Sequence, residues 1–530
     1  MPNLDKRLDF VFRDWDHDDR PGAAVAVLKG TKTIYSRGFG LASLEHGLPI
    51  SVDTRFRIAS ITKQFTCALV LQLAEDGKLS LDDPLGKFLA PVAPFAANLS
   101  LRTLMHNASG LHDHLALVAL AGGGFDRRLR EPALNDLILR QRGVNFQADT
   151  AFGYSNANFL LLTRVVEKVA GQSFEALLRQ RLLAPLGMDD TALVREPETV
   201  VPNLATPYVK TANGYRRALF ALDVTGDGGM VSTVADLAKW MRAMVKPPPR
   251  LKATLEGLAT RDSFRPSRVA NRYAFGLEHG IFRGVGTISH GGLLPGWRAE
   301  FLRIPELDLG VIVTANVDAL DPLVQARRVV EAMVKPQLAP IPVPKPHATP
   351  EPGHYWHEAS GTLVLIERRD GAPRATMWGT PMRLQPVDAT RWVAVRGVFP
   401  LTFSVAEGGL RIESSNGRGM VLERLKRLVK TGPHDLVGRY HAPELGGEWI
   451  VTHEGRTLEL QIRGDFGASG PWPVTPITAD AAEVTIVSPP WTATYVIRRR
   501  RYDTGWTSSL VLTGARVQNM VLKRIYGDDE

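Results

Sequence analysis

A proline-rich stretch in the second half of the chain sets the first limit on how this sequence can fold. Residues 335–353 read KPQLAPIPVPKPHATPEPG. Proline has no backbone N–H and fixes φ, so such a run can form neither a helix nor a central strand. It is typical of an extended linker instead. We therefore expect a domain boundary here, with a first domain over residues 1–338 and a linker over 339–352.

The part of the chain after the linker repeats itself. The triplet GHY at 353–355 is matched by GRY at 438–440, and MVLER at 420–424 is matched by MVLKR at 520–524. Both copies are rich in short alternating runs separated by turns, a pattern that indicates antiparallel β-structure. We therefore predict two similar antiparallel β-barrel domains. Their expected bounds are 353–430 and 431–530.

The second copy is longer than the first, and one segment best accounts for the extra residues. The stretch RGDFGASGPWPVTP at 463–476 is rich in glycine and proline, which suits a long exposed loop. Loops on a rigid scaffold often carry function, so we expect this one to reach outside its own domain and to control specificity. The residues expected to do so are Asp465, Phe466, Gly467, Ala468, Ser469 and Gly470.

The chain before the linker has strand patterns at both ends and helical patterns in the middle. The stretch at 23–40 reads as a β-hairpin, helical patterns dominate over 56–245, and strands return at 299–316. This order predicts one α+β domain whose sheet is completed by the two ends of the segment.

One apolar segment of this domain contains an unexpected lysine. The stretch FRIASITKQFTCALVLQLAEDGKL at 56–79 is apolar nearly all round, which is typical of a buried helix. Ser60 and Lys63 lie three residues apart, so a helix places both side chains on one face. Serine is a poor nucleophile until a base takes its proton, and a desolvated lysine has a lowered pKa and can be that base. The pair is therefore a candidate nucleophile and base.

Two further motifs follow in the chain. The stretch FGYSNANF places Tyr154 and Asn156 just before a predicted helix. The stretch TISHGGLLPGW places His290, Gly291 and Gly292 after a short β run, where glycines would let a substrate lie close to strand backbone. Each motif alone is weak evidence, but the three in this order are far more specific than any one of them.

This arrangement resembles the penicillin-recognising serine hydrolases, the group that contains class C β-lactamases, D-alanyl-D-alanine carboxypeptidases and related esterases. The stretches LRTLMHNASGLHDH at 101–114 and GGMVSTVADLAKWM at 228–241 are similar to segments of that family, so the resemblance covers about residues 8–335. It implies a β-lactamase-like domain, with an antiparallel sheet flanked by helices, that works through an acyl-enzyme without a metal or organic cofactor.

The resemblance also implies roles for single residues. These are acylation of Ser60, proton transfer by Lys63 and Tyr154, hydrogen bonding of Asn156 to Lys63 or the substrate, and lining of the site by His290. The oxyanion hole would combine the Ser60 N–H with one near Gly292, and losing one such donor typically costs about 3 kcal/mol. His290 stands where β-lactamases more often have a lysine that helps to receive a substrate carboxylate, which argues against efficient lactam hydrolysis.

A domain of this size followed by two barrels is similar to the D-aminopeptidases of that family, which remove D-residues from the free N-terminus of peptides, amides and esters. The resemblance thus implies a serine exopeptidase for N-terminal D-amino acids. It also implies that β-lactams inhibit the enzyme and that the chain forms a homodimer. A free ammonium needs a carboxylate partner. Asp227, in TGDGGMVST, is our candidate because the resemblance puts this segment at the edge of the site.

Two other functions stay open at this point. One is an esterase or D-amino-acid amidase on the same site, which rates on D-alanine amide and on a short p-nitrophenyl ester would distinguish. The other is a penicillin-binding module that is acylated but barely turns over, with the barrels as partner-binding surfaces.

Composition argues against several other classes of function. The 530 residues are 44% hydrophobic and 22% charged, which is typical of a globular protein too long for one core. The net charge of +9 is spread along the chain, and the one dense basic run, at 495–503, reads as a solvated strand face, so no nucleic-acid partner is expected. The N-terminus lacks the apolar core of a signal peptide and no uncharged run could span a bilayer, so we expect a cytoplasmic protein without membrane contact.

Neither a disulfide nor a metal site is expected. Cys67 is the single cysteine and lies in the apolar helix, so a buried structural role is predicted for it. His106, His112 and His114 have a spacing that fits no standard zinc site.

Overall fold

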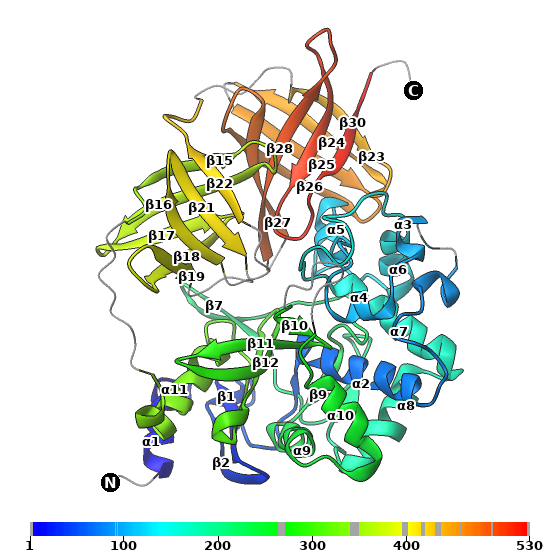
Figure 1. The fold of residues 1–530 in the computed structure, drawn as a ribbon, viewed down its shortest axis with the longest axis vertical. Helices are drawn as coiled ribbons and strands as arrows, with labels where there is room; N and C mark the ends of the chain where they lie inside the picture. The colour runs from blue at the N-terminus through cyan, green and yellow to red at the C-terminus, as the bar shows by residue number, and fades with distance from the viewer. Residues whose placement is uncertain are drawn as a thin grey trace.

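The protein folds into one mixed α+β domain followed by two closed antiparallel β-barrels, which confirms the predicted fold class (Figure 1). The structure is a computed structural model. It describes residues 4–526 except 91, 93, 263–270, 340–348, 395–400, 415–418, 430–435, 456 and 489–490. The expected linker falls largely on 340–348, outside the described residues, and a 3-10 turn, η8 (Lys335–Gln337), precedes it.

An antiparallel sheet in the order β10-β11-β12-β13-β14-β1-β2 forms the centre of the first domain. Strands from the two ends of the domain meet where β1 pairs with β14, with Ala23 opposite Ala315 and Lys29 opposite Leu309. The two ends of the segment therefore complete one sheet. The bounds are β1 (Ala23–Lys29), β2 (Lys32–Phe39), β10 (Tyr273–Ala274), β11 (Leu277–Phe282), β12 (Val285–Leu294), β13 (Trp297–Ile304) and β14 (Leu309–Ala315).

Helices cover both faces of this sheet, and alternate residues of β1 face the two sides. Val25 and Val27 pack with α1 (Leu4–Phe12) and α11 (Pro322–Val334). Ala24 and Ala26 belong to the larger core on the opposite face. The helices of that larger side are α2 (Thr62–Glu75), α3 (Pro94–Ala97), α4 (Leu101–Met105), α5 (His114–Leu120), α6 (Glu131–Leu139), α7 (Asn156–Ala170), α8 (Phe174–Leu178), α9 (Val234–Val245) and α10 (Lys252–Leu258).

Short strands complete the first domain beside this layer. They are β3 (Leu41–Ser43), β4 (Leu48–Pro49), β5 (Phe56–Arg57), β6 (Ala192–Leu193), β7 (Tyr208–Thr211), β8 (Gly214–Arg217) and β9 (Met230–Ser232). The pairing of β5 with β9 brings the chain just before Ser60 next to the chain just after Asp227.

The repeated motifs close the two barrels. In the first barrel Tyr355 of β15 lies opposite Arg424 of β22, and in the second Tyr440 of β23 lies opposite Arg524 of β30. The strands of the first are β15 (Gly353–His357), β16 (Thr362–Arg369), β17 (Ala372–Met377), β18 (Thr380–Pro386), β19 (Arg391–Ala394), β20 (Leu401–Ala406), β21 (Gly409–Ser414) and β22 (Gly419–Arg424). Those of the second are β23 (Gly438–Ala442), β24 (Gly447–Glu454), β25 (Thr457–Gly464), β26 (Gly467–Pro476), β27 (Ala481–Ser488), β28 (Trp491–Arg501), β29 (Thr507–Thr513) and β30 (Met520–Ile525).

The segment 463–476 is a β-hairpin rather than the long loop that its composition predicted. Strands β25 and β26 pair across a tight turn at Asp465 and Phe466, with a register shift between Leu460 and Ile462. Such a shift lets a strand accommodate glycine and proline that an unbroken ladder would exclude. Residues 467–470 are therefore part of a strand.

The second barrel packs against the helical side of the first domain, as Figure 1 shows above α5 and α6. The Trp449 indole N–H donates to the Leu120 carbonyl at 3.1 Å. Glu444 accepts from the Arg142 backbone N–H at 2.7 Å. The hairpin turn at 465–466 contacts the end of α5, since the Phe466 N–H donates to the Ala121 carbonyl. These contacts attach the barrel to the domain that carries Ser60.

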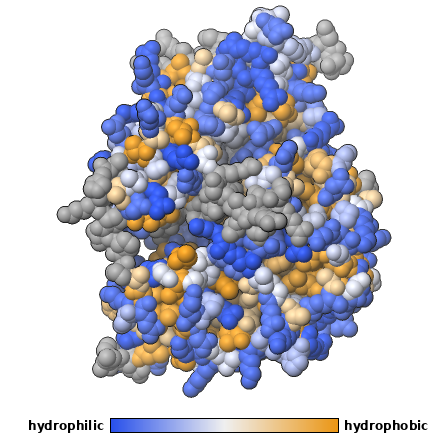
Figure 2. Space-filling model, in the orientation of Figure 1, coloured by the Kyte–Doolittle hydropathy of each residue, from blue (hydrophilic) through white to orange (hydrophobic). Residues whose placement is uncertain are grey.

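Among the described residues, no helix is long and apolar enough to cross a membrane. The face drawn in Figure 2 mixes hydrophilic side chains with small scattered apolar groups.

Candidate active site

Ser60 lies in a 3-10 turn, η2 (Ala59–Ile61), directly before α2 begins at Thr62. Ala59, the residue before it, has φ of 47°, in the left-handed region that residues other than glycine rarely adopt. Strained backbone of this kind is concentrated at functional sites. The turn keeps Ser60 partly exposed while Lys63, within the helix, is fully buried.

The Lys63 ammonium group has three acceptors. Its Nζ lies 3.0 Å from Ser60 Oγ and 2.8 Å from Asn156 Oδ1, and it also donates to the Asp227 carbonyl. Burial lowers the pKa of Lys63 to about 7, although nearby carboxylates oppose the shift. A neutral amine can donate to two of these acceptors and offer its lone pair to the third group. The geometry therefore allows Lys63 to accept the Ser60 proton near neutral pH.

Tyr154 and Asn156 frame this pair at the start of α7. The Tyr154 hydroxyl hydrogen-bonds to Ser60, and burial raises its pKa, so the phenol stays protonated. Its ring centroid is 5.0 Å from Lys63 Nζ. The Asn156 amide donates to Asp113 Oδ2 at 2.8 Å, which leaves Oδ1 directed at Lys63.

His290 is buried on β12 with both ring nitrogens occupied. Nδ1 is 2.7 Å from the Gly291 carbonyl, which can only accept, so Nδ1 carries the proton. Nε2 then accepts from the Tyr273 hydroxyl at 3.0 Å. Burial, with Lys63 nearby, lowers the pKa of His290 to about 3. This histidine is therefore neutral near pH 7 and does not supply the positive charge of a lysine at the same place.

Gly291 and Gly292 point to opposite faces of β12. Gly292 is buried, and a Cβ there would lie 2.2 Å from the Ile58 carbonyl oxygen. Only glycine therefore lets the Ser60 turn approach this strand so closely. Gly291 is exposed, and its Cβ would meet Glu300 Oε2 at 3.4 Å, an ordinary contact.

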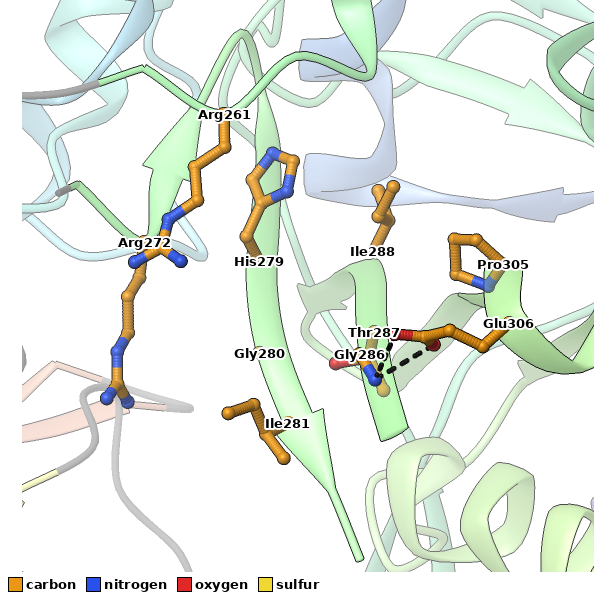
Figure 3. Close-up of a pocket in the computed structure, with 10 residues that line it drawn as sticks. All are labelled: Arg261, Arg272, His279, Gly280, Ile281, Gly286, Thr287, Ile288, Pro305 and Glu306. Carbon is orange, nitrogen blue, oxygen red and sulfur yellow. Dashed lines mark hydrogen bonds between the residues drawn. The ribbon is translucent and has the colours of Figure 1, made fainter. Parts of the chain in front are cut away.

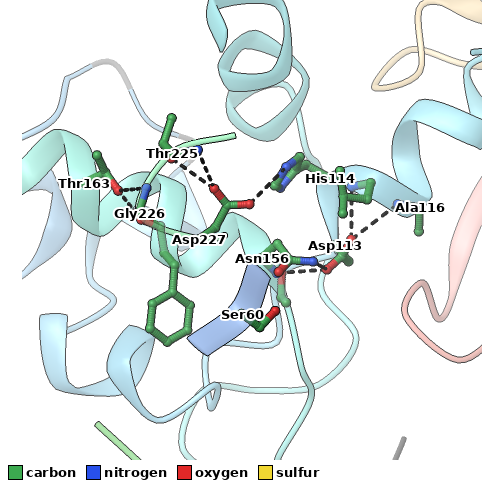
Figure 4. A network of polar contacts seen from close by, with 12 residues as sticks. Ser60, Asp113, His114, Ala116, Asn156, Thr163, Thr225, Gly226 and Asp227 are labelled. Atoms are coloured by element: carbon green, nitrogen blue, oxygen red, sulfur yellow. Dashed lines mark hydrogen bonds and ion pairs between the residues drawn. The ribbon is translucent and has the colours of Figure 1, made fainter. Parts of the chain in front are cut away.

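Asp227 lies inside the network rather than on an open wall (Figure 4). Its side chain is 4% exposed. Oδ1 accepts from the N–H and hydroxyl of Thr225, and Oδ2 lies 4.0 Å from His114 Nε2. A substrate ammonium would have to displace these contacts, so this placement does not support the predicted direct role.

The structure adds residues that the motifs did not reveal. Asp113 and His114 lie in the stretch LRTLMHNASGLHDH. From the sequence alone, we considered the histidines of this stretch only as possible metal ligands. Tyr273 and Arg516 gave no sequence signal. Within the described residues, no group of three His, Cys, Asp or Glu side chains is arranged to hold a metal ion.

The second barrel reaches this network through residues 514–519, between β29 and β30. Arg516 Nη1 is 3.1 Å from Asp113 Oδ2. The hairpin of 463–476 instead contacts residues that follow α5 and α6: Asp465 pairs with Arg140 at 2.8 Å, and the Phe466 carbonyl accepts from Arg127. The segment that joins the Ser60 network is thus a different one from the segment we predicted.

A separate pocket of about 290 Å³ opens beside β11 and β12 (Figure 3). Arg261, Arg272 and His279 line one side of it, and Glu306 accepts from the Gly286 N–H on the other. Ser60 and Lys63 do not line this pocket.

Comparison with known proteins identifies the family of the first domain. The family model described as Beta-lactamase matches residues 9–333. The chain belongs to the Beta-lactamase family. A D-aminopeptidase of Gluconobacter oxydans is 28% identical over 431 residues, which are 80% of each chain. A D-aminopeptidase of Brucella anthropi is 25% identical and covers 87% of this chain and 86% of its own.

The first domain also shares its fold with solved structures. The D-amino acid amidase of Ochrobactrum anthropi SV3, solved with D-phenylalanine, matches with a TM-score of 0.53 and 24% identity. The match covers 63% of this chain and 99% of the amidase. The two D-aminopeptidase relatives, by contrast, span most of the chain, including barrel residues.

Proposed function

We propose that the protein is a serine D-aminopeptidase, which removes N-terminal D-amino acids from peptides, amides and esters through an acyl-enzyme on Ser60. The observation that carries this proposal is the buried Lys63. Its Nζ lies 3.0 Å from Ser60 Oγ and also contacts Asn156 Oδ1 and the Asp227 carbonyl. The D-aminopeptidase relatives support the substrate class, because they match over most of both chains.

In the proposed acylation step, neutral Lys63 takes the Ser60 proton while Oγ attacks the substrate carbonyl. The proton then returns to the leaving amine, and the Tyr154 hydroxyl, bonded to Ser60, is placed to relay it. Water attacks the acyl-enzyme in the second half of the reaction, again with Lys63 as base. We assign the oxyanion hole to the Ser60 N–H and an N–H of β12 near Gly292, which packs on the same turn.

The test compares D-alanine and L-alanine p-nitroanilides, each with and without an N-acetyl group. We expect release of p-nitroaniline from the free-amine D compound alone, and none with Ser60→Ala or Lys63→Met. Cleavage of the L or acetylated compounds would refute the aminopeptidase specificity. Turnover of esters without any anilide cleavage would favour the esterase function instead.

The proposal also covers assembly, cellular location and inhibition. We propose a cytoplasmic homodimer that β-lactams acylate at Ser60. Light scattering of the purified chain tests the dimer, and cell fractionation tests the location. Mass spectrometry after incubation with benzylpenicillin tests the acylation, and an unmodified Ser60 would contradict it.

A further inference from the structure

The loop at 514–519 brings an arginine of the second barrel to the first domain. The Arg516 guanidinium donates to Asp113 Oδ2 at 3.1 Å, and its carbon lies 5.3 Å from the Tyr154 ring centroid. Asp113 is fully buried, whereas the Arg516 side chain is 32% exposed. A buried carboxylate needs a partner, and Arg516 supplies a positive charge to it.

Backbone contacts hold this loop in place. The Asp113 N–H and the Asn145 amide both donate to the Arg516 carbonyl, at 3.3 and 3.2 Å. The Gln518 N–H donates to Asn145 Oδ1 at 2.6 Å. His112 Nε2 lies 3.2 Å from the Gln518 carbonyl. The position of Arg516 is therefore set by several hydrogen bonds between the barrel and the first domain.

Asp113 connects Arg516 to Lys63 through Asn156. Its Oδ2 accepts from both the backbone N–H and the side-chain amide of Asn156, each at 2.8 Å. Because the Asn156 amide nitrogen faces a carboxylate, its carbonyl oxygen must face the other way, toward Lys63 Nζ at 2.8 Å. The four side chains thus form one chain of contacts from the barrel to the base.

We propose that Arg516 is a positioning residue through which the second barrel orients Lys63, by way of Asp113 and Asn156. This inference rests on the proposed acylation of Ser60. It gives the second barrel a role in orienting the catalytic base. It also predicts a charge effect that a purely structural contact would not have.

The charged groups around Lys63 come from several elements. Burial lowers the pKa of Lys63, and Arg516 lowers it further, while Asp227 and Asp113 raise it. Removing Arg516 takes away a repulsive charge and leaves Asp113 unopposed, so both effects raise the pKa of Lys63. The titratable and charged groups that face Lys63 are Cys67, Asp113, His114, Tyr154, Asp227, His290 and Arg516.

The experiment measures how fast a fluorophosphonate probe labels Ser60 in the full-length protein as a function of pH. With Arg516→Met we expect the acid midpoint of labelling to rise by about one pH unit, which makes labelling at pH 7 about fivefold slower. Arg516→Lys should return the midpoint toward the wild-type value. The matched control is Arg500→Met, at an exposed arginine of the same barrel, which should leave the midpoint unchanged.

An Arg516→Met protein that labels with the wild-type midpoint, however slowly, would overturn the proposal. If that variant does not fold, as judged by its melting temperature against Arg500→Met, Arg516→Gln serves as the neutral replacement with the same expected shift. The probe contains no D-amino acid, so wild-type labelling without cleavage of D-alanine p-nitroanilide would refute the D-aminopeptidase function alone. Wild-type protein that is not labelled at Ser60 would overturn both.

Discussion

Substitution of Gly292 by alanine tests whether the contact between β12 and the Ser60 turn sets the geometry of the site. A Cβ at this position would lie 2.2 Å from the Ile58 carbonyl oxygen, whereas real Cβ contacts are essentially never shorter than 3.0 Å. The atoms it would meet are backbone, so no side-chain rotation relieves the clash. Either β12 or the turn that carries Ser60 must move.

The movement required is about 1 Å, the difference between this distance and an ordinary carbon–oxygen contact. A displacement of that size between nucleophile and the proposed oxyanion donors is expected to lower kcat/KM about 100-fold, equivalent to about 2.7 kcal/mol. The loss should appear mainly in kcat, because the donors act on the transition state.

The assay is steady-state hydrolysis of D-alanine p-nitroanilide, with the melting temperature as a check on folding. Gly291→Ala is the matched control, since its Cβ faces the other side of the sheet and meets Glu300 at 3.4 Å. We expect the control to keep its activity within about threefold of wild type. A folded Gly292→Ala protein with near wild-type kcat, or equal losses in both variants, would refute the argument.

Four further predictions concern the charge and hydrogen bonds of the site. Because Lys63 must be neutral to act as base and its pKa is lowered to about 7, kcat/KM for p-nitrophenyl acetate should fall tenfold per pH unit below pH 6; a flat profile there would contradict this. The unfolded chain keeps the Lys63 proton up to its ordinary pKa, whereas the folded chain loses it near pH 7. Denaturant melts should therefore show wild type gaining stability relative to Lys63→Met as pH rises from 7 toward 10, by at most about 1.4 kcal/mol per pH unit. Tyr273→Phe should cost about 1–3 kcal/mol of stability, because it leaves His290 Nε2 buried without a donor; an unchanged melting temperature would argue against that hydrogen bond. Asp227→Asn should lower kcat equally for D-alanine p-nitroanilide and for p-nitrophenyl acetate, because its carboxylate faces His114; a rise in KM for the amine substrate only would restore it as the ammonium partner.

The elements that sequence reasoning placed well are those with strong local signals. The paired repeats and the strand–helix–strand order of the first segment can each be read from short stretches of sequence. The repeats also have a physical basis, since Tyr355 with Arg424 and Tyr440 with Arg524 are the pairs that close the barrels.

One error arose where composition alone was the guide. Glycine and proline at 463–476 predicted a loop, but cross-strand pairing with β25 makes this segment a hairpin. The role of Asp227 as ammonium partner stays a prediction: the family resemblance put its segment at the edge of the site, whereas the direction of its carboxylate depends on Thr225 and His114. Neither the pairing partner nor the side-chain direction is encoded in the local sequence pattern.

The sequence by itself determined the type of chemistry, because Ser60 and Lys63 need only one turn of backbone to meet. Tertiary structure decided how that chemistry is controlled. The pKa of Lys63 depends on burial and on the charges of Asp227, of Asp113 at the start of α5 and of Arg516 in the second barrel, which approach only in the folded chain. Arg516 and Asp113 lie 403 positions apart in sequence and 3.1 Å apart in space. No periodicity or motif connects two such residues, because their contact exists only through the packing of one domain on another.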